Sequence, residues 1–374
     1  MNTTTLRFKA LDVFRGMTIC LMIIVNTPGS WNYVYSPLDH AAWNGFTPTD
    51  LVFPSFLFAV GNAMSFVIPK WEDKGHLFVI KKVLIRTIIL FLIGYLLNWF
   101  PFFRLDDLQH IQPFPFSETR ILGVLQRIAL AYGMASLLIH FFTKKQLAYT
   151  SLFILIAYWG ILYFMGNSAD PYSIQGNAVL KLDTWMLGSN HLYMGEGFPF
   201  DPEGILSTFP SIVNVIAGYM TGYYLQKKGK NYESLFKIIL VGFICFVIAW
   251  WWNLILPINK KIWTSSYVVL TIGLDCMILA AIVFFLDIQE KNWGVFFFDV
   301  FGRNPLFIYL LSELGVIILS LIPIQGTNIS DWVYSSIFSK AGDYLGSFLY
   351  AVVFMFCCWL PGYFLFKKKI YIRI

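Results

Sequence analysis

Long apolar runs separated by short polar segments dominate the chain. Ten runs approach the roughly 20 residues that a helix needs to cross a bilayer: 10–27, 50–69, 83–102, 119–142, 147–165, 204–225, 237–256, 265–287, 301–323 and 346–366. Each is expected to be helical, because lipid offers no hydrogen-bond partners to an open backbone. The pattern therefore predicts an all-α polytopic membrane bundle, with a single domain over residues 1–374.

The composition excludes several other classes of protein. Of the 374 residues, 57% are hydrophobic and 13% are charged, whereas a soluble domain has about 25% charged residues. A cytosolic enzyme, a disordered protein and a nucleic-acid-binding module are therefore excluded, despite the net charge of +6. The five cysteines fall inside apolar runs, without disulfide or metal-ligand spacing, so no metal is expected.

The basic residues predict the orientation in the membrane. With the N-terminus inside, the inside segments hold 17 of the 27 Lys and Arg residues, and the outside segments hold 5. Cytoplasmic loops are the ones enriched in Lys and Arg. The chain is therefore expected in the inner membrane of a cell. Both termini should lie in the cytoplasm, and loops 28–49 and 166–203 should lie outside.

Polar residues inside the apolar runs are candidates for function, because they are costly in lipid. In the first run, Asp12 and Arg15 are three residues apart and can pair on one helix face. Asn26 returns to nearly the same face, further along the helix. The stripe indicates either a buried ion pair with a packing Asn, or the wall of a pathway across the membrane.

Arginines form two further sets. Arg120 and Arg127 are seven residues apart in the fourth run and would share a helix face, so they pair with acids or bind an anionic ligand. Arg15, Arg86 and Arg303 fall near predicted cytoplasmic ends of runs. They reach lipid headgroups from there, or together grip the phosphates of a cytoplasmic ligand.

Two acids and one histidine complete the candidate chemistry. Asp275 and Glu313 lie near the middle of their runs, where they serve either as proton relays or as protonated hydrogen-bond donors. His40 precedes Asp50 by ten residues at the start of the second run. The two side chains can form a pair in which the carboxylate fixes the imidazole tautomer; the alternative is an ordinary loop histidine.

Seven motifs, in order between residue 7 and about residue 313, resemble the heparan-α-glucosaminide N-acetyltransferase family, and in particular its bacterial relatives. They are Asp12-Val-Phe-Arg15-Gly, Ile-Val-Asn26, His40-Ala-Ala-Trp43-Asn44-Gly45, Thr49-Asp50-Leu-Val-Phe-Pro54, Arg120-Ile-Leu-Gly-Val-Leu-Gln126-Arg127, Phe200-Asp201-Pro202-Glu203-Gly204 and Phe301-Gly302-Arg303-Asn304-Pro305. Their order and spacing make the resemblance specific.

The resemblance implies a transmembrane acyltransferase fold and an activity. Family members pass the acetyl group of cytosolic acetyl-CoA to the amine of a terminal glucosamine on the far side of the membrane. The essential histidine of the family maps onto His40, and its functional Asn and acid map onto Asn26 and Asp50. Direct transfer, with His40 as general base, is favoured over an acetyl-histidine intermediate, which stays open.

Binding residues follow from the same reasoning. The phosphates of acetyl-CoA are expected at the cytoplasmic mouth, at Arg15, Arg86, Arg127, Arg303 and Asn304. The amino-sugar acceptor is expected at Trp43, Asn44, Asp201 and Glu203, because sugars stack on aromatic rings and ammonium groups pair with carboxylates. The acceptor sugar and the oligomeric state, including a homodimer, stay open.

The rival hypothesis is an amino-sugar transporter in which Asp275 and Glu313 couple substrate movement to protons. A third reading is a membrane protein that has no catalytic activity. His40 and Asn26 favour the transferase, because a permease does not require them at the outer face.

Overall fold

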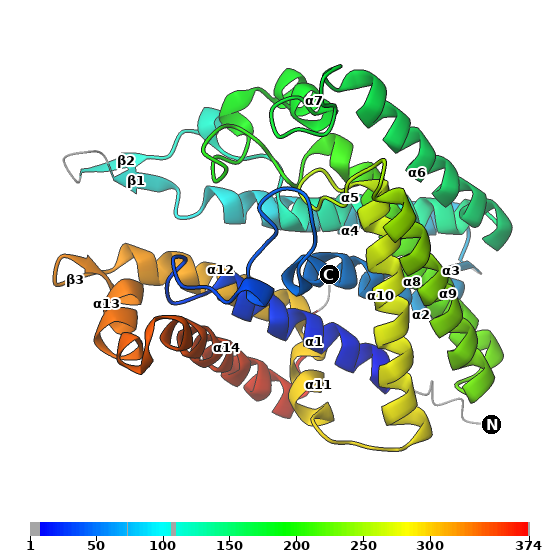
Figure 1. Cartoon of the computed structure of the whole chain (residues 1–374). Helices are drawn as coiled ribbons and strands as arrows, with labels where there is room; N and C mark the ends of the chain where they lie inside the picture. Colours follow the sequence, from blue (N-terminus) through cyan, green and yellow to red (C-terminus); the bar gives the residue numbers. More distant parts are fainter. Residues whose placement is uncertain (1–7, 73, 106–109, 373–374) are drawn as a thin grey trace.

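Helices make up most of the fold (Figure 1). The computed structural model describes residues 8–372, except 73 and 106–109. The helices are α1 Lys9–Asn26, α2 Val52–Val67, α3 Pro69–Glu72, α4 His76–Trp99, α5 Val124–Phe141, α6 Lys144–Met165, α7 Ala178–Leu187, α8 Ile205–Lys228, α9 Tyr232–Trp252, α10 Ser265–Val283, α11 Val295–Arg303, α12 Pro305–Leu321, α13 Ile329–Ser336 and α14 Asp343–Lys367.

Two small antiparallel hairpins accompany the helices. In the first, β1 Phe103–Leu105 pairs with β2 Ile111–Pro113, and in the second, β3 Pro323–Ile324 pairs with β4 Thr327–Asn328. A short 3-10 helix, η2, covers Pro48–Leu51 and runs directly into α2. The hairpins and η2 lie between the long helices, so they leave the helical architecture unchanged.

All ten predicted segments contain a helix, which confirms the all-α polytopic class. Within the described residues, seven helices are long and apolar enough to span a membrane, and the bent pair α11 and α12 makes an eighth. The two predicted segments outside this set are α1 and α4. Helix α1 has 18 residues and carries Lys9, Asp12 and Arg15. These three charges make it too polar to count among the membrane-spanning candidates.

The start of α5 differs from the sequence prediction. The predicted run begins at 119, but the helix begins at Val124. Residues 119–123 are held as a loop by Asn98, whose amide donates to the carbonyl oxygens of Arg120 (3.2 Å) and Leu122 (2.8 Å). Arg120 and Arg127 therefore do not share a helix face, because Arg120 precedes the helix.

The ninth predicted run is broken. Helix α11 ends at Arg303, and α12 begins at Pro305 with an 83° change of direction. Proline lacks the N–H that would continue the helix, and its ring disfavours a helical conformation for the preceding residue. The chain thus turns through nearly a right angle here, and Asn304 lies at the bend.

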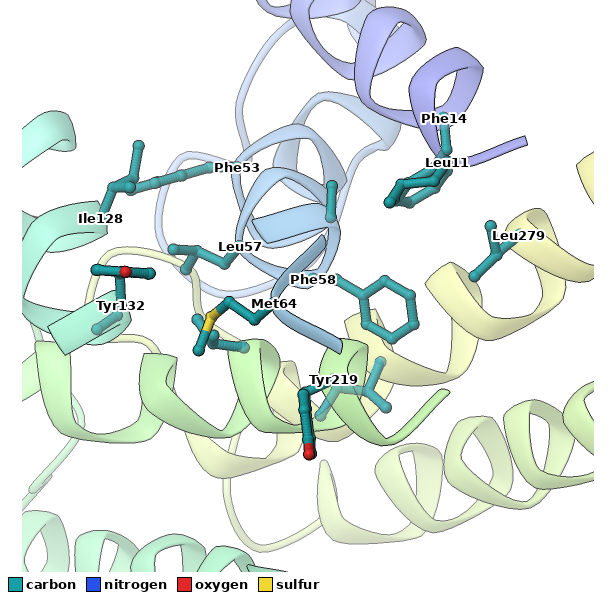
Figure 2. Packing of buried hydrophobic residues seen from close by; sticks show 14 of the residues in the cluster. Leu11, Phe14, Phe53, Leu57, Phe58, Met64, Ile128, Tyr132, Tyr219 and Leu279 are labelled. Carbon is teal, nitrogen blue, oxygen red and sulfur yellow. The ribbon is translucent and has the colours of Figure 1, made fainter. Parts of the chain in front are cut away.

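Helix α2 occupies the middle of the bundle and packs against α1, α5, α8 and α10. Figure 2 shows its side chains pointing in several directions: Phe53 and Leu57 lie near Ile128 of α5, and Phe58 and Met64 lie near Tyr219 of α8. Leu57 and Phe58 are fully buried. Since α2 follows directly on η2, this packing fixes the start of α2 and the Asp50 side chain just before it.

Glycines allow the closest helix contacts. A Cβ added at Gly61 of α2 would overlap the carbonyl oxygen of Val215 on α8, and one added at Gly218 would overlap the carbonyl oxygen of Phe58. Small residues let membrane helices approach until their backbones touch. Helices α2 and α8 therefore form one tightly packed pair.

Candidate functional site

The structure brings His40 and Asp50 together, as the sequence predicted. His40 Nδ1 lies 2.7 Å from Asp50 Oδ1. The carboxylate of Asp50 is fully buried, whereas 36% of the His40 side chain is exposed. A carboxylate only accepts hydrogen bonds, so Nδ1 carries the proton, and Nε2 keeps a lone pair for chemistry.

Local hydrogen bonds hold Asp50 in this position. Its Oδ2 accepts from the backbone N–H of Thr47 (3.0 Å), the hydroxyl of Thr47 (3.1 Å) and the backbone N–H of Ala41 (3.2 Å). Thr47 and Asp50 form a capping box at the start of η2. One carboxylate oxygen is thus used by the backbone, and the other faces the imidazole.

Lys260 joins this pair, and sequence reasoning had missed it. Its Nζ lies 3.1 Å from both ring nitrogens of His40 and 3.8 Å from Asp50 Oδ1. Only 18% of the side chain is exposed. Burial lowers the pKa of the Lys260 ammonium below its ordinary value, and the charges of Asp50 and Glu203 partly oppose this shift.

Two backbone segments are clamped together to make this contact. The Gly45 N–H donates to the carbonyl oxygen of Ile258 at 2.8 Å, and the Asn259 amide donates to Asn44 Oδ1 at 3.1 Å. The separation of 220 residues between His40 and Lys260 explains why no spacing in the sequence indicates the contact. The only sequence signal is a polar Asn-Lys-Lys stretch between two apolar runs.

A second charged cluster lies near the first. Arg120 binds Asp201 through two hydrogen bonds (2.9 and 2.7 Å) and Glu203 through a third (2.6 Å). Its guanidinium also lies over the Tyr193 ring, 4.6 Å from the centroid. Burial favours the neutral form of Glu203, but the charges of Arg120, Arg127 and Lys260 outweigh burial and lower its pKa. Asp201 and Glu203, predicted to bind the acceptor, are thus tied to Arg120.

Arg127 belongs to this second cluster. It is fully buried, donates to the carbonyl oxygen of Pro202 at 2.7 Å and to the hydroxyl of Ser207, and stacks 4.6 Å from the centroid of Trp263. It therefore lies beside Glu203 and the Lys260 loop.

The other predicted acceptor residues lie on the His40 loop. Trp43 donates from its indole N–H to the carbonyl oxygen of Tyr172 at 2.9 Å and packs edge-on against Phe200, with ring centroids 5.6 Å apart. Asn44 is exposed. Trp43 and Asn44 thus follow His40 on the same loop. Trp43 is anchored to Tyr172, whereas Asn44 is exposed to solvent and bound to Asn259.

Three predicted donor-binding residues meet at the junction of α1 and α11. Arg15 donates to the carbonyl oxygen of Gly302 (2.9 Å) and to Asp12 (2.9 Å), which confirms the predicted ion pair. Arg303 binds Asp299 at 2.8 and 3.0 Å. The Asn304 amide donates to the carbonyl oxygen of residue 370 at 3.0 Å.

The fourth donor-binding candidate stands apart from this junction. Arg86 of α4 lies over the ring of Tyr132 on α5, with its guanidinium carbon 4.8 Å from the centroid. Its Nε is buried and has no hydrogen-bond partner among the residues that the structure describes. The predicted cofactor set is therefore divided: three members share one junction, and Arg86 lies on the α4–α5 contact. Arg127 lies in the Arg120 cluster instead of at the predicted cytoplasmic mouth.

Asn26, the last residue of α1, lines a polar groove of about 510 Å³. Trp31, Asp331, Tyr334 and Tyr350 also line this groove. In the part of the chain that the structure describes, Asn26 makes no hydrogen bond with His40 or Asp50. The resemblance gives Asn26 a role beside His40, but in the structure Asn26 faces this groove at the end of α1.

These features define a multi-pass helical membrane protein whose loops hold an oriented imidazole beside a buried carboxylate and a lysine. A family model described as heparan-alpha-glucosaminide N-acetyltransferase, catalytic, matches residues 7–247. The chain belongs to this family. The match covers Asn26, the His40–Asp50 pair and the Arg120 cluster, whereas Lys260 and the α11–α12 corner lie beyond it.

Two animal proteins, both named heparan-alpha-glucosaminide N-acetyltransferase, are similar over most of the chain. The mouse protein is 26% identical over 368 residues, which cover 82% of this chain and 53% of the mouse protein. The human protein is 26% identical over 370 residues, with the same coverage. The chain thus spans about half the length of the curated relatives it matches.

Proposed function

We propose that the chain transfers the acetyl group of acetyl-CoA to the amine of a glucosamine-type sugar. The observation that carries this proposal is the His40–Asp50 pair at 2.7 Å, in which Nε2 is left as the reactive nitrogen. Family membership supplies the reaction class.

His40 acts as the general base in this proposal. As the sugar nitrogen attacks the acetyl carbonyl, His40 Nε2 takes a proton from that nitrogen, and a C–N bond forms. When the C–S bond breaks, the imidazolium returns the proton to the sulfur of coenzyme A. Asp50 stabilises the transient imidazolium through Nδ1. Attack by Nε2 itself, which would give an acetyl-histidine, uses the same geometry and is the second route.

Asn44 and Asn26 are the proposed amide donors to the carbonyl oxygen. Asn44 is the better placed of the two, because it lies on the His40 loop and its Oδ1 already accepts from Asn259, which leaves its N–H groups as donors. Asn26 opens into its own groove. A donor aimed at the developing oxyanion contributes about 3–4 kcal/mol in well-studied hydrolases.

The acceptor is proposed to lie against Trp43 and Asn44, with Asp201 and Glu203 behind them. Arg120 neutralises much of both carboxylates, so we propose that they shape the wall of the site and that Trp43 supplies the stacking face. The chemical class of acceptor is a sugar with a free amine.

The donor is proposed to enter from the opposite membrane face. Arg15, Arg303 and Asn304 meet at one junction, and each arginine can exchange an internal partner for a phosphate oxygen, since guanidinium binds both with similar geometry. The excess of basic residues in the predicted inside segments supports a cytoplasmic position for this junction. The pantetheine arm would then extend toward His40.

The transporter hypothesis gains no support. The family and both animal relatives are named as acetyltransferases. Asp275, its proposed proton relay, is fully buried and accepts a hydrogen bond from Ser55 of α2, as a structural carboxyl between two packed helices does.

The test uses purified protein in detergent with radiolabelled acetyl-CoA and glucosamine. We expect labelled N-acetylglucosamine, and a loss of about 100-fold or more in rate for His40→Ala, the scale of general-base loss. The same variant should still bind coenzyme A in calorimetry, with a Kd between about 1 µM and 1 mM. Wild-type protein that binds coenzyme A and acetylates no amino sugar would contradict the proposal.

A further inference from the structure

Lys260 has no role in the reaction described so far, yet it touches the reacting nitrogen. Its Nζ lies 3.1 Å from Nε2 of His40, the atom that takes the proton from the amine or bonds to the acetyl carbon. The acetyl oxygen lies two bonds from Nε2 in an acetyl-histidine; with His40 as general base, it lies beyond the shared proton, the amine nitrogen and the acetyl carbon. An ammonium at this place is therefore within reach of the oxygen on which negative charge develops.

We propose that Lys260 is a catalytic residue whose ammonium stabilises the oxyanion of the tetrahedral intermediate. This inference rests on the proposed function. As the C–N bond forms, the π electrons of the carbonyl move onto oxygen, and Lys260 donates a hydrogen bond to it. As the C–S bond breaks, the electrons return and the hydrogen bond weakens. Lys260 neither gains nor loses a proton, and the proton balance through His40 is unchanged.

The surroundings of Lys260 suit this role. The side chain is 18% exposed, so its charge acts in a medium of low polarity, where a fixed charge stabilises an oxyanion more strongly than in water. Two hydrogen bonds hold its loop against the His40 loop. Asp50 lies 3.8 Å away, beyond the range of a hydrogen bond, so a donor of the ammonium remains for the substrate.

Lys261 provides a matched control. It is the next residue, it is also 18% exposed, and its Nζ is held by Glu196 at 2.6 Å. The two lysines are therefore neighbours in the sequence with the same charge and burial, and only Lys260 contacts His40. A general effect of lysine on the folding or charge of this loop should affect both.

The experiment compares Lys260→Met, Lys260→Arg and Lys261→Met in the acetylation assay. We expect Lys260→Met to lower kcat by about 100-fold with the KM for acetyl-CoA nearly unchanged. Lys260→Arg should recover part of this loss, and Lys261→Met should stay within about threefold of wild type. Burial lowers the pKa of Lys260, so the wild-type rate should fall at alkaline pH as the ammonium loses its proton. In Lys260→Arg, this loss of rate should occur at a higher pH.

A second measurement does not depend on activity. Diethyl pyrocarbonate modifies neutral imidazole, and mass spectrometry quantifies its product at His40. At a fixed alkaline pH, removing the ammonium that faces Nε2 should raise the rate of this modification in Lys260→Met and leave it unchanged in Lys261→Met. If wild type acetylates nothing, the proposed function fails, while this readout still tests the contact. A folded Lys260→Met with wild-type kcat, or with an unchanged modification rate, overturns the proposal.

Discussion

At the scale of single residues, the site depends on how a carboxylate and an imidazole are held. Asp50 is buried and uses one oxygen for backbone N–H groups, so its orientation is fixed before any substrate arrives. His40 is more exposed and gains its orientation from Asp50. This division predicts different results for substitutions at the two positions.

Asp50→Asn should lower the acetylation rate less than His40→Ala does. The amide can still accept a hydrogen bond from Nδ1, but it carries no charge to stabilise the imidazolium. We expect a loss of about 10- to 100-fold in kcat, measured with saturating acetyl-CoA. His191→Gln is the control, because the hydrogen-bond partner of His191 is the carbonyl oxygen of Thr119 (2.7 Å) and not the Asp50 carboxylate. Equal losses in Asp50→Asn and His40→Ala would contradict an orienting role.

Asp183 gives a pH-dependent prediction. Burial raises its pKa to about 7, partly opposed by the N–H of Ile205, which donates to it at 3.0 Å. Between about pH 4 and 7 the folded carboxyl holds a proton that the unfolded chain has lost, so stability falls as pH rises through this window. Asp183→Asn removes this titration, and its melting temperature should fall less than that of wild type between pH 5 and 8. Parallel profiles would contradict the assignment.

At the scale of elements, the sequence predicted the helices far better than their contacts. Apolar length alone located the ten long helices that the structure describes, because lipid leaves a spanning chain few alternatives to a helix. The short helices α7 and α13 lie outside the predicted runs. Two boundaries were wrong for local reasons. The apolar run predicts a helix at Arg120, but Asn98 holds this segment as a loop. Likewise, the run across Pro305 predicts one helix, but the chain bends there by 83°.

The candidate site was predictable in part. The His40–Asp50 pair lies within one loop, so spacing could indicate it. Lys260 comes from a loop 220 residues away, and the pairing of Arg120 with Asp201 joins positions 81 residues apart. Contacts of this kind depend on how the helices pack, which one sequence does not specify through any local pattern.

The α2–α8 contact makes a prediction about packing. Gly61→Ala should destabilise the protein, because the new methyl group meets the backbone of Val215; overpacking costs about 1–3 kcal/mol. Gly160 of α6 is the control, since a Cβ there meets no atom within 4 Å. Gly160→Ala should be neutral or slightly stabilising. Thermal unfolding in detergent measures both, and an equally tolerated Gly61→Ala would contradict the tight contact.

At the scale of the whole molecule, the arrangement separates two kinds of site. His40, Lys260 and the Arg120 cluster gather near the starts of α2, α10, α5 and α8. Arg15, Arg303 and Asn304 meet at the α1–α11 junction. A transferase that takes its donor from one side and its acceptor from the other requires such a separation. The proposed orientation rests on the distribution of basic residues. It predicts that a reporter that works only in the cytoplasm is active when fused to the C-terminus.

The most direct test of the whole account is acetyl transfer across a sealed membrane. Protein of one orientation is reconstituted in vesicles, with acetyl-CoA on the side of the Arg15–Arg303 junction and glucosamine on the side of His40. The account predicts N-acetylglucosamine on the glucosamine side alone, and none with His40→Ala. Product formed only when both substrates share one side, or transfer that persists in a folded His40→Ala, would contradict it.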